Sequence, residues 1–188
     1  ALAAAECAQK TWAKTSLDER IDWMLKLRDA CMVERERIVD MVSAESGRPY
    51  PAACADFDWM ITSFQYYSEE ARRVYGTTFN NHSTPNGSVY HIVARRPIGV
   101  VVGHVAWNYP LGNAGLKIAP SVVSGCSCII KPSSQTPLAT LYIGEIAERI
   151  GFPAGVINIL SGPSNEVART LNESTIPRMI TLIGSSET

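Results

Sequence analysis

An asparagine and a tryptophan stand where an apolar run ends, within the segment His104–Gly112. The run itself, Ile98–Gly103, is typical of a strand that is buried on both faces. Trp107 and Asn108 come shortly after it, and Tyr109 separates Asn108 from Pro110. Burying the Asn108 amide in an apolar core would be unfavourable, and a turn alone would not require this asparagine because Asp-Gly could form it. The amide is a hydrogen-bond donor and acceptor, so Asn108 is either a candidate for chemistry or a cap for the next helix.

Three further apolar runs end in residues that suit a bound ligand: Lys131–Ser134, Ser161–Pro163 and Gly184–Ser185. Gly184 permits close approach of a phosphate, which the Ser185 hydroxyl and the free amides of a starting helix can hold. An ordinary turn with a helix cap accounts for this Gly-Ser pair as well. The Gly-x-Gly-x-x-Gly fingerprint of dinucleotide-binding folds is absent from the sequence, so the pair alone identifies no ligand.

Apolar runs and amphipathic segments alternate from residue 97 onward. They predict strands over 98–102, 126–131, 156–160 and 179–183, and helices over 110–123, 137–150 and 164–172. This alternation is typical of an open, mainly parallel α/β sheet with right-handed crossovers. Ligands of such sheets bind beyond the carboxyl ends of the strands. We therefore expect the strand ends named above to lie at the ligand site.

A helical segment and a β excursion precede this alternation. Ser16 and Glu19 suit a capping box, Gly47 would end a second helix, and a third helix should span about 51–74. Turn-forming residues follow, and residues 88–95 alternate as a strand with one exposed face would. The sequence thus predicts three parts: N-terminal helices (1–76), a β excursion (77–97) and a sheet-containing part (98–188).

Composition excludes several classes of function. The formal net charge of −1 gives no reason to expect a nucleic-acid partner, and no apolar stretch is long enough to cross a membrane. The five cysteines include no Cys-x-x-Cys pair, and His82 and His91 have no second ligand at metal-binding spacing. We expect no metal site, no secretory signal and free thiols in a reducing compartment, the cytoplasm.

Six motifs occur in an order that resembles the aldehyde dehydrogenase superfamily. They are Pro97-Ile98-Gly99-Val100, Trp107-Asn108-Tyr109-Pro110, Lys117-Ile118-Ala119-Pro120, Lys131-Pro132-Ser133-Ser134-Gln135-Thr136-Pro137, Gly151-Phe152-Pro153-Ala154-Gly155-Val156-Ile157-Asn158 and Gly184-Ser185. The resemblance is loose over residues 12–76 and close over 97–188. It implies that the sheet is the incomplete Rossmann-like cofactor domain of that family.

The resemblance assigns chemistry to Asn108. The corresponding asparagine of the family donates its side-chain amide to the aldehyde oxygen, on which charge grows while a cysteine thiolate attacks. Trp107 and Tyr109 resemble packing residues on the cofactor side and the substrate side. Lys117 matches a lysine near the water and proton path, although a lysine on a helix surface is the more common case.

The same resemblance implies a dinucleotide cofactor. Lys131 matches the lysine that holds the adenosine ribose hydroxyls, and Gly162 resembles the segment that passes the adenine. Ser134 stands where NAD-preferring relatives have a carboxylate, so we expect NADP first and NAD second. The expected cofactor-binding residues are Val105, Ala106, Trp107, Lys131, Ser133, Ser134, Gly162, Gly184 and Ser185.

Two departures from the family pattern lie beside Asn108. Ala106 replaces the usual proline, and His104 stands where a residue lining the nicotinamide side would be, with a packing role as the alternative. The family's nucleophilic cysteine and general-base glutamate lie downstream of the Gly-Ser motif. The five cysteines of this sequence lack the nucleophile's context: Cys7, Cys31, Cys54, Cys126 and Cys128.

The resemblance therefore implies the amino-terminal part of an NAD(P)-dependent enzyme that oxidises an aldehyde through a thiohemiacetal and a thioester. The β excursion resembles the family's oligomerisation arm, so a homo-oligomer is expected, and Lys-Pro-x-Ser-Gln-Thr-Pro favours a small semialdehyde as substrate. One alternative is a non-catalytic domain that binds nucleotide or serves as a scaffold. Another is a relative acting on acyl phosphates or acyl-CoA, which the Trp-Asn-Tyr-Pro motif disfavours.

Overall fold

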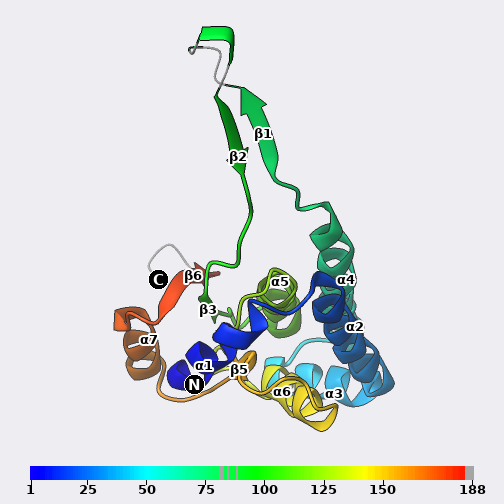
Figure 1. Cartoon of the computed structure of the whole chain (residues 1–188). Coiled ribbons are helices and arrows are strands. Elements are labelled where there is room, and N and C mark those ends of the chain that lie inside the picture. The colour runs from blue at the N-terminus through cyan, green and yellow to red at the C-terminus, as the bar shows by residue number, and fades with distance from the viewer. Residues whose placement is uncertain (81–82, 84, 88, 185–188) are drawn as a thin grey trace.

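A parallel four-stranded sheet forms the centre of the protein (Figure 1). The computed structural model describes residues 1–80, 83, 85–87 and 89–184. The strands stand in the order β5-β4-β3-β6, which confirms the predicted open parallel α/β sheet. Their bounds are β3 (Val100–His104), β4 (Cys128–Lys131), β5 (Ile157–Ile159) and β6 (Pro177–Leu182).

Helices connect consecutive strands, as the sequence predicts. They are α5 (Pro110–Val123), α6 (Leu138–Arg149) and α7 (Ser164–Glu173). The prediction for β3 was wrong by two residues at each end: Gly99 has a φ of 127°, which is outside strand geometry. At the other end, Gly103 and His104 continue the ladder opposite Ile130 and Lys131. This extension brings His104 to the carboxyl edge of the sheet.

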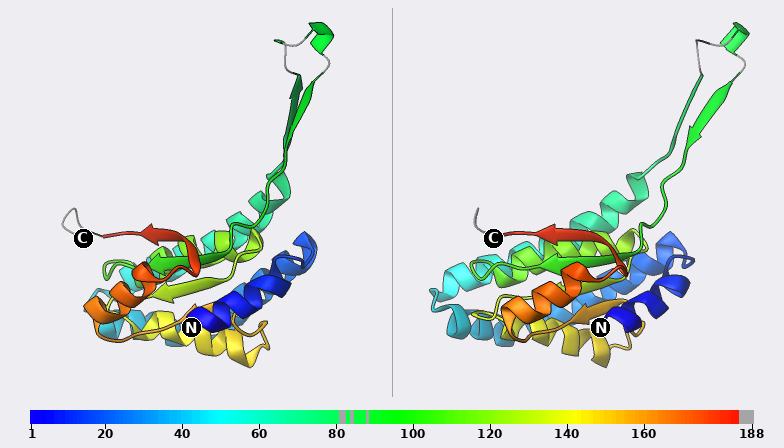
Figure 2. Two further views of the ribbon diagram at one scale, coloured as in Figure 1. Left: turned by 60° about the vertical axis from the view of Figure 1, so that its left-hand side comes forward. Right: turned by 90° about the vertical axis from the view of Figure 1, so that its left-hand side faces the viewer.

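The two faces of the sheet are covered by different helices (Figure 2). On one face α5 and α6 lie against the strands, with an outer layer of α2 (Leu17–Val33), α3 (Arg35–Ser46) and α4 (Tyr50–Glu70). The opposite face carries α1 (Leu2–Trp12) and α7. Alternate residues of β3 divide between these faces, since Val101 belongs to the larger apolar cluster and Val100 and Val102 to the smaller one.

Local signals account for several helix ends. The Ser16 Oγ accepts a hydrogen bond from the Glu19 amide at 3.2 Å, which is one half of the predicted capping box. Gly47 ends α3 with a φ of 68°. The third predicted helix continues beyond α4 as a 3₁₀ turn, Ala71–Arg73. Among the described residues, every helix is too short or too polar to span a lipid bilayer.

A β-hairpin projects from the body of the protein (Figures 1 and 2). Its strands are β1 (Thr77–Asn80) and β2 (Tyr90–Val93), paired antiparallel, with a short 3₁₀ turn at Pro85–Gly87. All residues of both strands are exposed. The prediction of a strand with only one exposed face was therefore wrong, because the hairpin leaves the body and neither face has a neighbour there.

Candidate functional site

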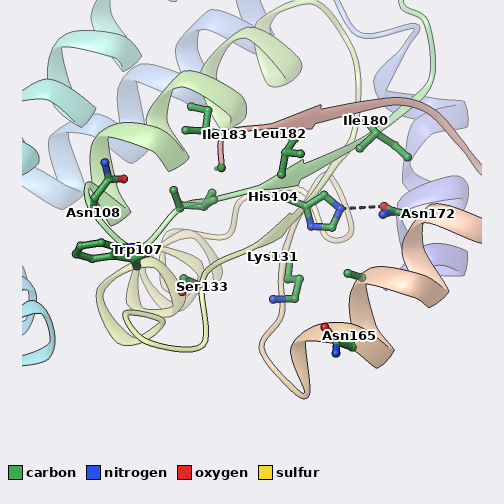
Figure 3. A pocket seen from close by; sticks show the side chains of 14 residues that line it. His104, Trp107, Asn108, Lys131, Ser133, Asn165, Asn172, Ile180, Leu182 and Ile183 are labelled. Atoms are coloured by element: carbon green, nitrogen blue, oxygen red, sulfur yellow. Dashed lines mark hydrogen bonds between the residues drawn. The ribbon is translucent and has the colours of Figure 1, made fainter. Parts of the chain in front are cut away.

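A cleft of about 670 Å³ lies at the carboxyl ends of β3, β4 and β6, beside α7 (Figure 3). Its volume is within the usual range for small-molecule sites. Trp107 and Asn108 lie at one end of the cleft, Asn165 and Asn172 at the other, and Lys131 between them. The cleft is lined by His104, Val105, Ala106, Trp107, Asn108, Lys131, Ser133, Asn165, Ala168, Asn172, Ile180, Leu182, Ile183 and Gly184.

The loop between β3 and α5 presents Trp107 and Asn108 to the cleft. Backbone bonding fixes both sides of this loop: the Val105 amide donates to the Lys131 carbonyl at 3.0 Å, and the Thr136 hydroxyl donates to the Trp107 carbonyl at 3.2 Å. The Trp107 indole remains 57% exposed. A large aromatic side chain that is held by its backbone and exposed in a cleft is available to pack against a ligand.

Asn108 is anchored by two side chains. The Arg48 guanidinium donates to the backbone carbonyl of Asn108 and lies over the Tyr109 ring, 4.5 Å from its centroid. The Asn113 side-chain amide donates to the Oδ1 of Asn108 at 3.4 Å. The side chain of Asn108 is therefore held by its oxygen, and its nitrogen faces away from that bond.

A carboxylate from another helix caps the start of α5. Asp56 of α4 is fully buried and accepts from the Leu111 amide at 3.2 Å and the Gly112 amide at 2.8 Å. Desolvation by burial raises the pKa of Asp56, while the two amide bonds and the Arg48 charge lower it. This cap fixes the first turn of α5, and with it the position of Asn108 immediately before the helix.

Lys131 brings a positive charge to the centre of the cleft. It ends β4 opposite His104, and its side chain is nearly buried, with the residue only 6% exposed. Its Nζ donates to the Pro132 carbonyl at 3.3 Å. Burial lowers the pKa of Lys131 because the ammonium group loses part of its hydration. A ligand with hydroxyl or phosphate oxygens would offer this group acceptors in place of water.

Helix α7 contributes polar residues to the cleft that were not predicted from the sequence. Asn172 pairs with the His104 ring, with 2.9 Å between Oδ1 and Nε2, so His104 both lines the cleft and contacts α7. Asn165 lies on the same side of the cleft (Figure 3). Their spacing could have revealed them. Asn165 and Asn172 are seven residues apart and so share one face of a helix, and this helix begins directly after Gly162 and Pro163.

Some predicted site residues lie outside the cleft. Gly162 lines a neighbouring hollow of about 330 Å³ together with Leu160 and Pro163. Ser134 is exposed on the loop after β4, next to Ser133, which does line the cleft. Ser185 falls outside the described residues. Six of the nine expected cofactor residues therefore line the cleft: Val105, Ala106, Trp107, Lys131, Ser133 and Gly184.

Lys117 is buried, which rules out the alternative of a lysine on a helix surface. It is 3% exposed and packs so closely under β3 that a Cβ added at Gly103 would lie 2.8 Å from the Lys117 Cδ. Burial lowers the pKa of the Lys117 ammonium group. Lys117 is not among the residues that line the cleft.

The cysteines offer no nucleophile at this cleft. All five lie in the described part of the chain as free thiols, and none of them lines it. Cys31, Cys126 and Cys128 are buried, and burial raises the pKa of Cys31 and of Cys128 to about 12. Within the described residues no three His, Cys, Asp or Glu side chains are grouped so that they could hold a metal ion.

Comparison with known proteins gives a consistent picture. The model of the aldehyde dehydrogenase family matches residues 1–188. Glutarate-semialdehyde dehydrogenase of Pseudomonas aeruginosa is 32% identical over 187 residues, which are 100% of this chain and 38% of that protein. The NADP(+) succinate-semialdehyde dehydrogenase of Escherichia coli is 29% identical, again over 100% of this chain and 38% of that protein.

A solved structure agrees with this match. The crystal structure of an aldehyde dehydrogenase from Brucella melitensis biovar abortus superimposes with a TM-score of 0.92 at 31% identity. The alignment covers 99% of this chain and 38% of that one. The chain thus spans little more than a third of the length of these relatives.

Proposed function

Since the chain belongs to the aldehyde dehydrogenase family, we propose that it forms the amino-terminal, cofactor-binding part of an enzyme that oxidises an aldehyde to a carboxylic acid with NAD(P)+. The observation that carries this proposal is the cleft itself, which combines the Asn108 amide with the Lys131 cation at the strand ends. In the same proposal residues 1–76 are N-terminal helices of the cofactor domain, 77–97 an oligomerisation arm and 98–188 the Rossmann-like part.

The donors around the cleft fit a dinucleotide. Lys131 and Ser133 would hold ribose hydroxyls, the Trp107 indole would pack against the cofactor, and Gly184 leaves room for a phosphate. When bound, such a cofactor supplies the hydride acceptor of the oxidation. The residues of this chain contribute binding and orientation, and they do so from strand ends, where backbone position is fixed by the sheet.

Asn108 would act on the aldehyde oxygen. A donor that is held in place before the reaction stabilises charge on that oxygen without having to reorganise, and losing one such donor costs roughly 3 kcal/mol of transition-state stabilisation. Its anchoring by Arg48 and Asn113 supports this role. The alternative of a simple helix cap has less support, since Asn108 makes no side-chain cap bond and Asp56 occupies the Leu111 and Gly112 amides.

The test is the Asn108→Ala substitution in an enzyme that contains this chain and has the full length of its relatives. We expect kcat to fall by roughly a hundredfold or more with little change in the dissociation constant of the cofactor. Asn158→Ala is the matched control, because its side chain donates to the Cys128 and Gly155 carbonyls away from the cleft. It should lower stability and leave kcat unchanged. A near-normal kcat with weakened folding in Asn108→Ala would make Asn108 a structural residue.

The preferred cofactor and the substrate are supported by fewer residues than the reaction itself. The serine at position 134 supports NADP+ as the preferred cofactor, and the name of the related Escherichia coli enzyme includes the same cofactor. A small semialdehyde as substrate is supported by the names of the related Pseudomonas and Escherichia enzymes. The absence of a cysteine among the lining residues of the cleft supports the second candidate, a nucleotide-binding domain that has no turnover of its own.

A further inference from the structure

We propose that Asn113 is a positioning residue that decides which end of the Asn108 amide faces the substrate. The inference rests on the proposed function, in which the Asn108 nitrogen donates to the aldehyde oxygen. It concerns a bond between two side chains of this chain, and it makes Asn113 necessary for the orientation of that donor.

The helix places Asn113 behind Asn108. Asn113 is the fourth residue of α5, and its backbone amide donates to the Tyr109 carbonyl at 3.0 Å. Helical side chains lean toward the amino terminus of their helix, so the Asn113 side chain reaches back over the first turn. Its amide meets the Oδ1 of Asn108 at 3.4 Å.

The burial of Asn113 indicates that its contact with Asn108 has a specific role. Asn113 is only 3% exposed and lies on a helix whose other buried residues are mostly apolar or small. An apolar residue of similar size would avoid the cost of burying an amide. Among the described residues, the side chain of Asn113 forms its hydrogen bond with Asn108.

The length of this bond points to orientation more than to stability. At 3.4 Å it is longer than a typical N–H···O bond, and catalytic hydrogen bonds often tighten only when the substrate is bound. Its consequence is directional. With Oδ1 engaged by a donor, the Nδ2 of Asn108 is left to face an acceptor, whereas a flipped amide would turn an oxygen toward the developing oxyanion.

Other contacts fix the backbone of Asn108, so that rotation of its side-chain amide is the motion that remains. Arg48 holds its backbone carbonyl, and Asp56 fixes the turn that follows. The backbone at Asn108 is therefore fixed by groups other than Asn113, and rotation of the side-chain amide is what Asn113 controls. This separation allows an experiment that changes the orientation of the amide while the backbone is retained.

The experiment uses Asn113→Leu and Asn113→Asp in the complete enzyme. Leucine removes the donor at similar volume, and we expect kcat to fall by about tenfold, the usual scale for one hydrogen bond. An aspartate is an acceptor at neutral pH and would attract the Asn108 nitrogen, so its loss should exceed that of leucine and approach that of Asn108→Ala. As the pH is lowered, the Asn113→Asp enzyme should recover relative to wild type, because a protonated carboxyl can donate again.

Each substitution is then combined with Asn108→Ala in a double-mutant cycle. If Asn113 acts through Asn108, neither substitution lowers kcat by more than about twofold in that background. Equal losses in both backgrounds would overturn the inference, as would an Asn113→Asp enzyme without pH-dependent recovery. Ser121→Ala is the control on the same helix, since its hydroxyl donates to the Lys117 carbonyl and makes no contact with Asn108.

The cycle also separates this inference from the proposed function. If Asn108→Ala by itself leaves kcat unchanged, Asn108 is not the donor and the proposed function fails together with the inference. If Asn108→Ala lowers kcat as expected and the Asn113 substitutions do not, only the inference fails. The dissociation constant of the cofactor should stay the same in all variants.

Discussion

Ser134 is the residue with the clearest consequence for cofactor choice. It is exposed on the loop that leaves β4, three residues after Lys131 and beside Ser133 in the cleft wall. A carboxylate about 4 Å from the 2′-phosphate of NADP+ would oppose binding by about 4 kcal/mol per charge pair at an effective dielectric constant of 20. Serine has no such charge, and its hydroxyl can donate to a phosphate oxygen.

We therefore expect the enzyme to bind NADP+ at least as tightly as NAD+, and Ser134→Glu to reverse that order. Titration of NADPH and NADH by fluorescence compares the two cofactors in their reduced forms, which carry the same 2′ groups as NADP+ and NAD+. Ser134→Gln is the matched control, because it has nearly the size of glutamate without the charge and should keep the wild-type order. Clearly tighter NADH binding that Ser134→Glu leaves unaffected would make Ser134 a passive loop residue.

Individual residues show how much of the candidate site could be predicted from the sequence. Asn108 and Lys131 both line the cleft, as expected because strand ends of a parallel sheet converge on one edge, while their roles there stay predictions. Asn113 was not predicted, because its relation to Asn108 depends on the direction in which a helical side chain leans. Gly162 was expected at the cofactor and lies in a neighbouring hollow, since a strand-end position does not specify on which side of α7 a glycine falls.

At the scale of elements, two helices of the site depend on carboxylates from the outer helical layer. Asp56 of α4 accepts from amides of α5, and Glu45 of α3 accepts from the Leu138 amide at 2.6 Å and the Ala139 amide at 3.2 Å at the start of α6. Neither helix has a side-chain cap of its own. Each carboxyl group accepts from amides that the first turn of a helix leaves without partners, so these contacts join the outer layer to the helices on the sheet.

These two caps give a stability contribution with a defined pH dependence. Desolvation raises the pKa of Asp56 and of Glu45 above their ordinary values of 3.8 and 4.5, although the amide bonds act in the opposite direction. A carboxyl whose pKa is raised in the folded state holds its proton longer there than in the unfolded state. Its contribution to folding is complete below the ordinary pKa and is lost as the pH rises through the folded-state pKa.

The prediction compares wild type with the double variant Asp56→Asn and Glu45→Gln, which keeps the shape and one acceptor oxygen of each cap. As the pH rises above 4.5, the melting temperature of wild type should fall relative to that of the double variant. Differential scanning fluorimetry over a pH series measures this difference. Glu148→Gln, at an exposed site of α6, is the control. A constant difference across the series would contradict the assignment.

The sequence could not reveal these caps. The bonded residues of α5 lie 55 and 56 positions from Asp56, and the residues of α6 lie 93 and 94 positions from Glu45. Patterns within one helix predict its existence, and most strands and helices were found in this way. A cap that comes from another helix depends on how two layers pack, which no local pattern contains.

At the scale of the whole molecule, the hairpin is the feature that suggests a partner. A two-stranded hairpin has little stability of its own in water, and this one exposes large apolar side chains: Phe79 50%, Tyr90 65% and Ile92 79%. Such residues are expected to be covered. We propose that a second copy of the chain covers them, as the homo-oligomer expected from the sequence would require.

Charge on the hairpin should therefore lower the oligomeric state. We expect Phe79→Asp combined with Ile92→Asp to give a smaller species by light scattering, with cofactor binding in the distant cleft retained. Val33→Asp is the control, since Val33 is an apolar residue that is 86% exposed at the end of α2. An unchanged molar mass in the hairpin variant would place the contact between copies elsewhere.

A further expectation concerns the 188-residue chain by itself. Because none of its cysteines lines the cleft and loss of the nucleophile removes most of the rate in acyl-transfer chemistry, it should not oxidise aldehydes. The assay supplies NADP+ and a short aldehyde and follows the absorbance of the reduced cofactor. Turnover that survives dialysis and disappears when one of the five cysteines is replaced would defeat this expectation.

The position of β6 in the sheet has a practical consequence for handling the protein. In the described part of the chain β6 is an outer strand, and Met179, Ile180 and Leu182 are each almost half exposed. An outer strand with apolar side chains and no charged residue between Arg178 and its end at Leu182 is a template for adding strands from other molecules. Solutions of the 188-residue chain alone should aggregate with increasing concentration, while the core behind α5 and α6 stays folded.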